Sequence, residues 1–181
     1  DVLVNNAGAS LPGGNSEWQS EVFEESVRIN LFSAFHVANA CHPLLRCSVL
    51  AGGASIISIA SMTSFFGQAM VPGYGAAKAG LINLTATLAV EWAPRVRVCA
   101  ITAGLIATEK AHMHYGSAAG IAAAAGTVPL GRLGVPDDVA DASLFLASPL
   151  ASYISGVDLT LHGGGSSPAF LTAVQAAMRG S

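Results

Sequence analysis

Two hydrophobic periodicities alternate along the chain. Short runs rich in Val, Ile and Leu, followed by small or polar residues, are typical of buried strands. These runs span residues 1–4, 54–60, 95–101 and 157–162. Longer stretches with apolar residues three and four positions apart are typical of helices packed against a core. These stretches span residues 16–45, 74–92 and 136–147.

Start and stop signals support the helices. Ser16 is an N-cap residue ahead of early acidic residues, and Pro136 precedes two aspartates at the positive end of a helix dipole. Pro94 ends the middle helix. Strands and helices alternate, and the connections are long enough for crossovers. This order predicts a doubly wound parallel α/β sheet.

The segment between the third and fourth strands has a different character. Residues 103–135 are rich in Ala and Gly and show little periodicity. We expect a mobile insert with one or two short helices there. The chain also begins inside an apolar run and without Met, so we expect further residues before Asp1.

The composition excludes some classes of binding partner. The chain is 52% hydrophobic and only 10% charged, against about 25% charged residues in ordinary soluble domains. We therefore expect a subunit interface or a missing part of the same domain. A net charge of −3 argues against a surface that binds nucleic acid or a membrane. The sequence also contains no uninterrupted apolar run of about 20 residues, the length that a membrane-spanning helix needs. The three cysteines form no C-x-x-C pair, which indicates reduced thiols in a cytoplasmic protein.

Polar residues after the apolar runs are the candidates for chemistry, because parallel α/β sheets bind ligands outside the carboxyl ends of their strands. Ser61 closes the second run, and Gly73-Tyr74-Gly75-Ala76-Ala77-Lys78 opens the next helix. Tyr74 and Lys78 lie one helical turn apart. A cation beside a phenol lowers its pKa of about 10 toward a useful acid-base range. Taken alone, this spacing also fits a surface tyrosine near a lysine.

Two further polar features need an explanation. Asn30 lies inside a predicted helix, where Asn is disfavoured because its side chain competes for backbone hydrogen bonds. His112 and His114 alternate in the insert, but no third ligand is near, so we expect no metal site. With Met113 and Tyr115, these histidines either line the substrate cleft or its lid, or face solvent.

Several motifs in one order carry a family resemblance. They are Asn5-Asn6-Ala7-Gly8, Ile29-Asn30-Leu31, Ser61, Tyr74 with Lys78, Ala103-Gly104-Leu105-Ile106-Ala107-Thr108, and Pro129-Leu130-Gly131-Arg132-Leu133-Gly134-Val135-Pro136-Asp137-Asp138-Val139-Ala140. With these motifs the chain resembles classical short-chain dehydrogenases/reductases. The resemblance implies the C-terminal part of a Rossmann-type sheet, strands 4 to 7 of the usual seven. It implies one partial domain over residues 1–181, with a substrate-loop insert at 108–132 and a tail at 166–181.

The resemblance also implies a role for each site residue. Tyr74 would be the general acid-base, and Ser61 would hold and polarise the substrate carbonyl. Lys78 would lower the pKa of Tyr74 and bind the nicotinamide ribose, while Asn30 would hold a water that links Lys78 to solvent. The cofactor would be NAD or NADP. Besides Tyr74 and Lys78, the residues that contact it would be Asn5, Ala7 and Gly8 toward the adenosine side and Gly104, Ile106 and Thr108 toward the nicotinamide.

The chain departs from the family pattern at three places. Ala103-Gly104 replaces the usual Pro-Gly, and His162 replaces an Asp before two glycines. The strand and Gly-rich turn that approach the pyrophosphate are not among these 181 residues, nor is the residue that distinguishes NAD from NADP. We therefore expect roughly three strands before Asp1 in the whole protein, and the 181 residues alone to be inactive.

Two functions remain open at this point. The first is an NAD(P)-dependent oxidoreductase that interconverts a secondary alcohol and a ketone, with a 3-oxoacyl thioester, a hydroxysteroid or a similar hydrophobic substrate. The second is an inactive fragment or degenerate copy that acts only by association. The paired helices of the family imply a homo-oligomer, a dimer or tetramer, formed through the helix that starts at Tyr74.

Overall fold

The computed structural model describes residues 1–11, 19–165, 170, 174 and 177–178. The predicted helix start at Ser16 and most of the predicted tail over residues 166–181 lie outside these residues. The chain divides into two compact units, residues 1–103 with 139–161 and residues 104–138 with 162–181. The first unit contains the sheet.

The sheet consists of four parallel strands in the order β1-β2-β3-β4. The strands are β1 (Val2–Asn5), β2 (Ala54–Ser61), β3 (Val96–Ala103) and β4 (Asp158–Leu161). Parallel neighbours require crossover connections, and helical segments lie between all consecutive strands. The predicted parallel α/β sheet is confirmed.

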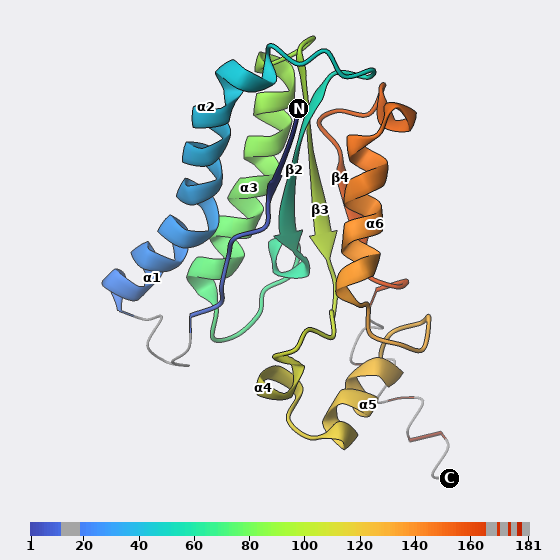
Figure 1. Ribbon diagram of the computed structural model, residues 1–181. Helices are drawn as coiled ribbons and strands as arrows, with labels where there is room; N and C mark the ends of the chain where they lie inside the picture. Colours follow the sequence, from blue (N-terminus) through green and yellow to red (C-terminus); the bar gives the residue numbers. More distant parts are fainter. Residues whose placement is uncertain (12–18, 166–169, 171–173, 175–176, 179–181) are drawn as a thin grey trace. The chain divides into compact units, whose positions relative to one another are not determined.

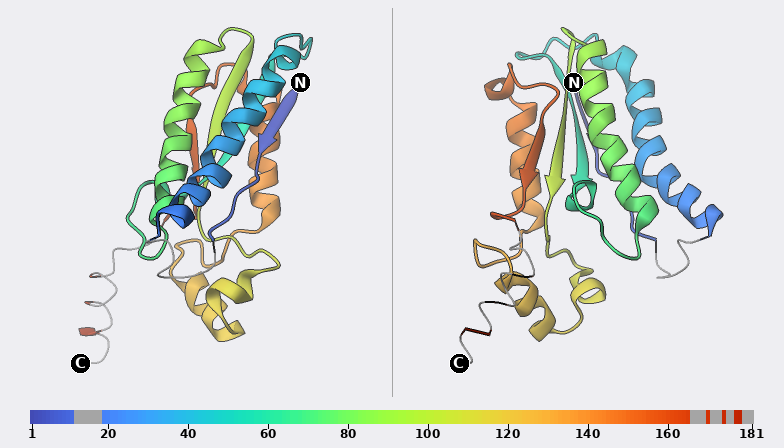
Figure 2. Two further views of the ribbon diagram at one scale, coloured as in Figure 1. Left: turned by 90° about the vertical axis from the view of Figure 1, so that its left-hand side faces the viewer. Right: turned by 180° about the vertical axis from the view of Figure 1, so that it is seen from behind.

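Helices cover both faces of this sheet (Figure 1). One face is covered by α2 (Ser33–Leu45) and α3 (Pro72–Glu91), and the other by α6 (Pro136–Ala147), as both views of Figure 2 also show. α1 (Ser20–Val27) packs against α3. Two 3₁₀ helices, η3 (Met62–Ser64) and η4 (Pro149–Ala151), follow β2 and α6. The doubly wound arrangement is therefore also confirmed.

Alternate residues of the strands supply two separate cores. Ile56 of β2 belongs to a buried cluster with Leu88 of α3, whereas the next residue, Ile57, belongs to a cluster with Leu146 of α6. Successive side chains of a strand point to opposite faces. A strand that is buried on both faces carries apolar and small residues almost throughout, as in the Ala-Ser-Ile-Ile-Ser-Ile-Ala-Ser sequence of β2, and β2 was predictable for this reason.

The long helix predicted over residues 16–45 is interrupted. Between α1 and α2, a π-helical segment η2 (Arg28–Phe32) has Asn30 at its centre. Single π turns within α-helices insert one extra residue and are frequent at functional sites. The local change in hydrogen bonding explains why an Asn is accommodated in the middle of a helical stretch.

Other boundaries also differ from the predictions by one or two residues. α3 begins at Pro72 and not at Tyr74, because the fixed φ of proline suits the first turn of a helix. β3 continues to Ala103 and not only to Ile101, since it pairs with β2 as far as Ser61. Asn5 belongs to β1 and not to the turn that follows.

The second unit contains two short helices, α4 (Ala111–Tyr115) and α5 (Ala118–Gly126). They lie within residues 103–135, where one or two short helices were predicted. The insert boundaries at 108–132 stay a prediction. In the part of the chain that the structure describes, no helix is long and apolar enough to span a membrane.

Arg97 of β3 joins three segments at the end of the sheet opposite Ser61. The residue is 7% exposed. Its Nε donates a hydrogen bond to Gly52 O at 3.1 Å, and its Nη1 donates to Leu146 O at 2.8 Å and to Ile154 O at 3.2 Å. Leu146 lies in the last turn of α6, where main-chain carbonyls carry partial negative charge. One buried guanidinium therefore satisfies three carbonyl groups.

We expect Arg97→Met to lower the free energy of unfolding by about 2–4 kcal/mol, because three carbonyl groups would lose their shared donor. Arg95→Met is the matched control, since Arg95 is exposed, and we expect it to lie within about 0.5 kcal/mol of the parent. Urea unfolding followed by circular dichroism measures both values. Equal effects of the two substitutions would contradict the role given to Arg97.

Candidate active site

Ser61 and Tyr74 meet where a strand ends and a helix begins. Ser61 is the last residue of β2, and Tyr74 lies in the first turn of α3. The Ser61 hydroxyl lies near enough to the Tyr74 phenol to lower its pKa. Ser61 Oγ also accepts a hydrogen bond from Thr63 N of η3 at 3.4 Å. The structure thus brings together the two hydroxyl groups that were predicted to converge on one substrate oxygen.

Two glycines allow neighbouring segments to approach Tyr74. A Cβ at Gly73 would lie 3.0 Å from Ser26 Cβ of α1, and a Cβ at Gly75 would lie 3.3 Å from Thr63 O of η3. A side chain at either position would force α3 away from its neighbour. The Gly-Tyr-Gly sequence therefore lets α1 and η3 pack on both sides of the helix start that carries Tyr74.

Lys78 lies one turn beyond Tyr74 and is almost completely buried, with 4% of its surface exposed. Its Nζ donates a hydrogen bond to Ile59 O of β2 at 2.7 Å and lies 5.7 Å from the centroid of the Tyr74 ring. Burial lowers the pKa of Lys78 from 10.5 to about 8, because desolvation penalises the ammonium form. The distance of 5.7 Å places the Lys78 side-chain nitrogen beside the Tyr74 ring.

The role predicted for Lys78, lowering the pKa of Tyr74, stays a prediction. Burial raises the pKa of Tyr74 above 10.0, and the nearby Ser61 hydroxyl opposes that shift only in part. Desolvation is the larger cause, because a buried phenolate loses its hydration. The arrangement favours a neutral phenol, which is a proton donor.

Asn30 connects the π-helical segment to the loop after β1. Its side chain is buried, with 1% exposed. Nδ2 donates to Ala9 O at 2.8 Å and to Ser26 O at 2.9 Å, while Oδ1 accepts from Ala9 N at 3.0 Å. Both N–H groups of the amide are therefore used to hold main chain in place, and the predicted water relay through Asn30 stays a prediction.

Gly8 is in close contact with both Asn30 and Lys78. A Cβ on Gly8 would lie 2.7 Å from Asn30 Oδ1 and 3.1 Å from Lys78 Nζ. No larger residue fits without displacing one of the two polar groups. Gly8, Asn30 and Lys78 therefore form one contact group, although they come from three segments far apart in the sequence.

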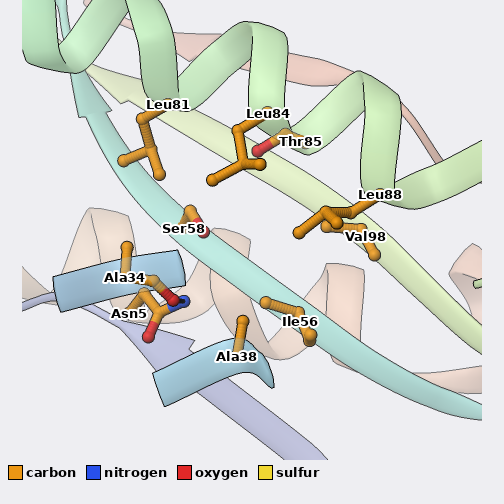
Figure 3. Close-up of a pocket in the computed structure, with 10 residues that line it drawn as sticks. All are labelled: Asn5, Ala34, Ala38, Ile56, Ser58, Leu81, Leu84, Thr85, Leu88 and Val98. Carbon is orange, nitrogen blue, oxygen red and sulfur yellow. Dashed lines mark hydrogen bonds between the residues drawn. The ribbon is translucent and has the colours of Figure 1, made fainter. Parts of the chain in front are cut away.

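The side chain of Asn5 has a different environment. Its Nδ2 donates to Ala34 O of α2 at 3.3 Å, and it lines a small cavity between the sheet and the two helices α2 and α3 (Figure 3). The other lining residues are Ala34, Ala38, Ile56, Ser58, Leu81, Leu84, Thr85, Leu88 and Val98. None of the four predicted catalytic residues lines this cavity, so it is separate from the candidate active site.

Comparison with known proteins identifies the family. Residues 1–166 match the sequence profile of a family described as enoyl-(acyl carrier protein) reductase. The chain belongs to the short-chain dehydrogenase/reductase family. The match includes the sheet, the helices around it and every candidate site residue.

Three members of this family are similar to the chain. A 3α-hydroxysteroid dehydrogenase of Mediterraneibacter gnavus is 37% identical over 164 residues, which are 90% of this chain and 64% of that protein. A 7α-hydroxysteroid dehydrogenase solved with NADH and 7-oxo glycochenodeoxycholic acid has a TM-score of 0.81 at 32% identity, with 93% of this chain and 64% of that chain covered. A structure from Agrobacterium tumefaciens with bound NADP has a TM-score of 0.80 at 36% identity, with 91% and 66% covered. This chain thus spans less than two thirds of the length of each of them.

The remaining motif residues of this short-chain dehydrogenase/reductase chain lie in both units. Ala7 and Gly8 are exposed in the loop after β1. Gly104, Ile106 and Thr108 belong to the second unit, where Ile106 pairs with Gly134. Within the described ranges, no three His, Cys, Asp or Glu side chains come together as metal ligands.

Sequence patterns did not indicate the main-chain groups that two residues contribute to the site. Ile59 O accepts the hydrogen bond of Lys78, and the main chain of Ala9 pairs with Asn30. Main-chain groups have no residue-type signature, so no motif could locate them. The glycines beside Tyr74 did carry a signal, because small residues flanking a polar one indicate close approach.

We expect Gly8→Val to destabilise the chain by about 1–3 kcal/mol, because the new side chain overlaps Asn30 Oδ1 and crowds Lys78 Nζ. Gly67→Val is the control, since a Cβ at Gly67 meets no atom within 4 Å. Urea denaturation measures both variants. A Gly8→Val variant as stable as Gly67→Val would show that the loop does not need the contact.

Lys78 should make stability depend on pH. Its pKa is about 8 in the folded chain and 10.5 without burial, so the unfolded state binds more protons between these values. The free energy of unfolding should therefore rise as the pH rises from about 8 toward 10. Lys78→Met should lack this rise, whereas the exposed control Lys110→Met should keep it. Urea unfolding between pH 7 and pH 9.5 tests this, and parallel pH profiles for the parent and Lys78→Met would contradict it.

Proposed function

We propose that the protein is an NAD- or NADP-dependent oxidoreductase that interconverts a secondary alcohol and a ketone. The observation that carries the proposal is the placement of Ser61 at the end of β2 near Tyr74 in the first turn of α3, with the buried Lys78 one helical turn away. These side chains supply a proton donor, a second hydroxyl for the same substrate oxygen and a cation. Membership of the family supports the same reaction class.

In the direction of reduction, the neutral Tyr74 phenol donates its proton to the carbonyl oxygen of the substrate. The raised pKa of Tyr74 suits this step, because the group stays protonated at neutral pH. Ser61 donates a hydrogen bond to the same oxygen and so polarises the carbonyl. In the reverse direction the phenolate form of Tyr74 takes the proton from the alcohol. When bound, the nicotinamide donates or accepts the hydride.

The donor set of Lys78 fits a nicotinamide cofactor. An ammonium carries three N–H donors, and Ile59 O accepts one of them. The other donors match the adjacent hydroxyl groups of a ribose. Asn5, Ala7 and Gly8 are proposed for the adenosine half. Gly104, Ile106 and Thr108 are proposed for the nicotinamide half.

The substrate proposed is a hydrophobic secondary alcohol or the matching ketone. The names of the two hydroxysteroid dehydrogenases support a steroid-like compound, and the name of a 3-oxoacyl-[acyl-carrier-protein] reductase of Chlamydia pneumoniae, 36% identical over 165 residues, supports an acyl thioester. A homo-oligomer through α3 is proposed on the exposure of Val90, which is 80% exposed on that helix. The free cysteines favour a reducing, cytoplasmic location.

A second candidate function is association without catalysis. Among the four strands of these 181 residues, β1 lies at one end of the order, and its side chains Val2 and Val4 are 44% and 46% exposed. An edge strand with exposed apolar side chains is suited to pairing with another strand. A chain that binds no nicotinamide nucleotide but forms stable complexes through β1 would have this function.

Tyr74→Phe should lower turnover by at least about a hundredfold, because the phenyl ring can neither give nor take the proton. Cofactor affinity should remain within about twofold of the parent value. Tyr153→Phe is the control, since Tyr153 is fully exposed at 102%. Both are made in the chain extended upstream as its gene encodes, and assayed with hydroxysteroids and 3-oxoacyl thioesters.

The outcome separates the two functions. Retained turnover in Tyr74→Phe would remove the acid-base role. A parent protein that neither binds NAD(P)H, measured by nicotinamide fluorescence, nor turns over either substrate class would leave association as the function.

A further inference from the structure

The loop over residues 104–108 is held by main-chain contacts to one glycine. Ile106 and Gly134 form a parallel bridge. Gly134 N donates to Leu105 O at 2.9 Å, and Ala107 N donates to Gly134 O at 2.8 Å. A Cβ on Gly134 would lie 2.6 Å from Ile106 Cδ1. The conformation of the loop therefore depends on the exact position of Gly134.

An ion pair holds the main chain on both sides of Gly134. Arg132 is bidentate to Asp138, with Nη1 to Oδ2 at 2.7 Å and Nη2 to Oδ1 at 2.8 Å. Arg132 Nη1 also donates to Leu133 O at 3.0 Å, and Val135 N donates to Asp138 Oδ2 at 2.7 Å. The residues immediately before and after Gly134 are thus attached to the same pair of charges.

The ion pair is formed throughout the neutral pH range. The hydrogen bonds from Arg132 and from Val135 N lower the pKa of Asp138 to about 2. The side chains are 55% and 28% exposed, and exposed ion pairs contribute little to global stability. Loss of this pair should therefore change local geometry more than it changes folding.

We propose that the Arg132–Asp138 ion pair positions the Ile106 loop for the nicotinamide half of the cofactor. The inference rests on the proposed function, in which Ile106 and Thr108 contact that half. Thr108 N donates to Ile106 O at 3.1 Å, so a displacement of Ile106 also displaces Thr108. Arg132 and Asp138 act only through Gly134, which makes them positioning residues and not catalytic ones.

The test uses ligands that contain or lack the nicotinamide ring. Arg132→Gln removes the bidentate pair, and Gly134→Ala places a methyl group against Ile106. Arg28→Gln is the matched control, because Arg28 and Glu25 form another exposed bidentate pair, with contacts of 2.7 and 2.6 Å. The proteins are made in the chain extended upstream as its gene encodes. NADH and NADPH are compared with ADP-ribose and its 2′-phosphate.

We expect the Kd of the preferred nicotinamide cofactor to rise roughly three- to tenfold in Arg132→Gln and Gly134→Ala. The Kd of the matching ADP-ribose should change by less than about twofold, and Arg28→Gln should match the parent for both ligands. Hydrogen exchange of the peptide over residues 104–108 should be faster in both test variants, because the bonds between Gly134 and the loop weaken.

Each other outcome overturns one specific statement. An equal loss of both kinds of ligand, or no change in either, would overturn the positioning role. Failure of the parent to bind any nicotinamide cofactor would overturn the proposed function instead. In that case unchanged hydrogen exchange at residues 104–108 in Arg132→Gln would also overturn the structural part of the inference.

Discussion

The candidate site depends on the buried amide of Asn30. This side chain exchanges two hydrogen bonds with the main chain of Ala9 and gives a third to Ser26 O. The first two fix the loop that follows β1, and the third holds the amide against the preceding turn of the π-helical segment. Gly8, the neighbour of Ala9, is thereby placed against Lys78 Nζ. One side chain thus connects the first strand, the interrupted helix and the lysine beside Tyr74.

Much of the fold could be predicted because burial leaves a clear pattern. β2 faces two cores, so its sequence contains only apolar residues and small serines, and the crossover lengths required parallel pairing. The hydrophobic pattern did not predict two helix boundaries, which depend on individual residues. Pro72 starts α3 two residues early, and the π-helical segment at Arg28–Phe32 is too short to alter a hydrophobic period. The anomalous Asn30 was the one signal of that break.

The members of the site could be predicted better than its electrostatics. Ser61, Tyr74 and Lys78 were located by their motif and by the position of strand and helix ends. The raised pKa of Tyr74 was not predicted, because it depends on how deeply the ring is buried. The ion pair between Arg132 and Asp138 was part of a recognised motif, yet its attachment to both neighbours of Gly134 required three-dimensional geometry.

The use of main-chain groups as hydrogen-bond partners has a consequence for how this chain can diverge. Ile59 O anchors Lys78, and the amide and carbonyl of Ala9 anchor Asn30. A substitution at position 59 or 9 changes a side chain but keeps the anchoring carbonyl, and only proline at position 9 would remove the N–H group. Ala9 is exposed, so its side chain is free to vary in size and polarity, whereas Ile59 also packs against a buried cluster of the sheet. The neighbouring Gly8 is less tolerant, because a Cβ there would lie 2.7 Å from Asn30 Oδ1.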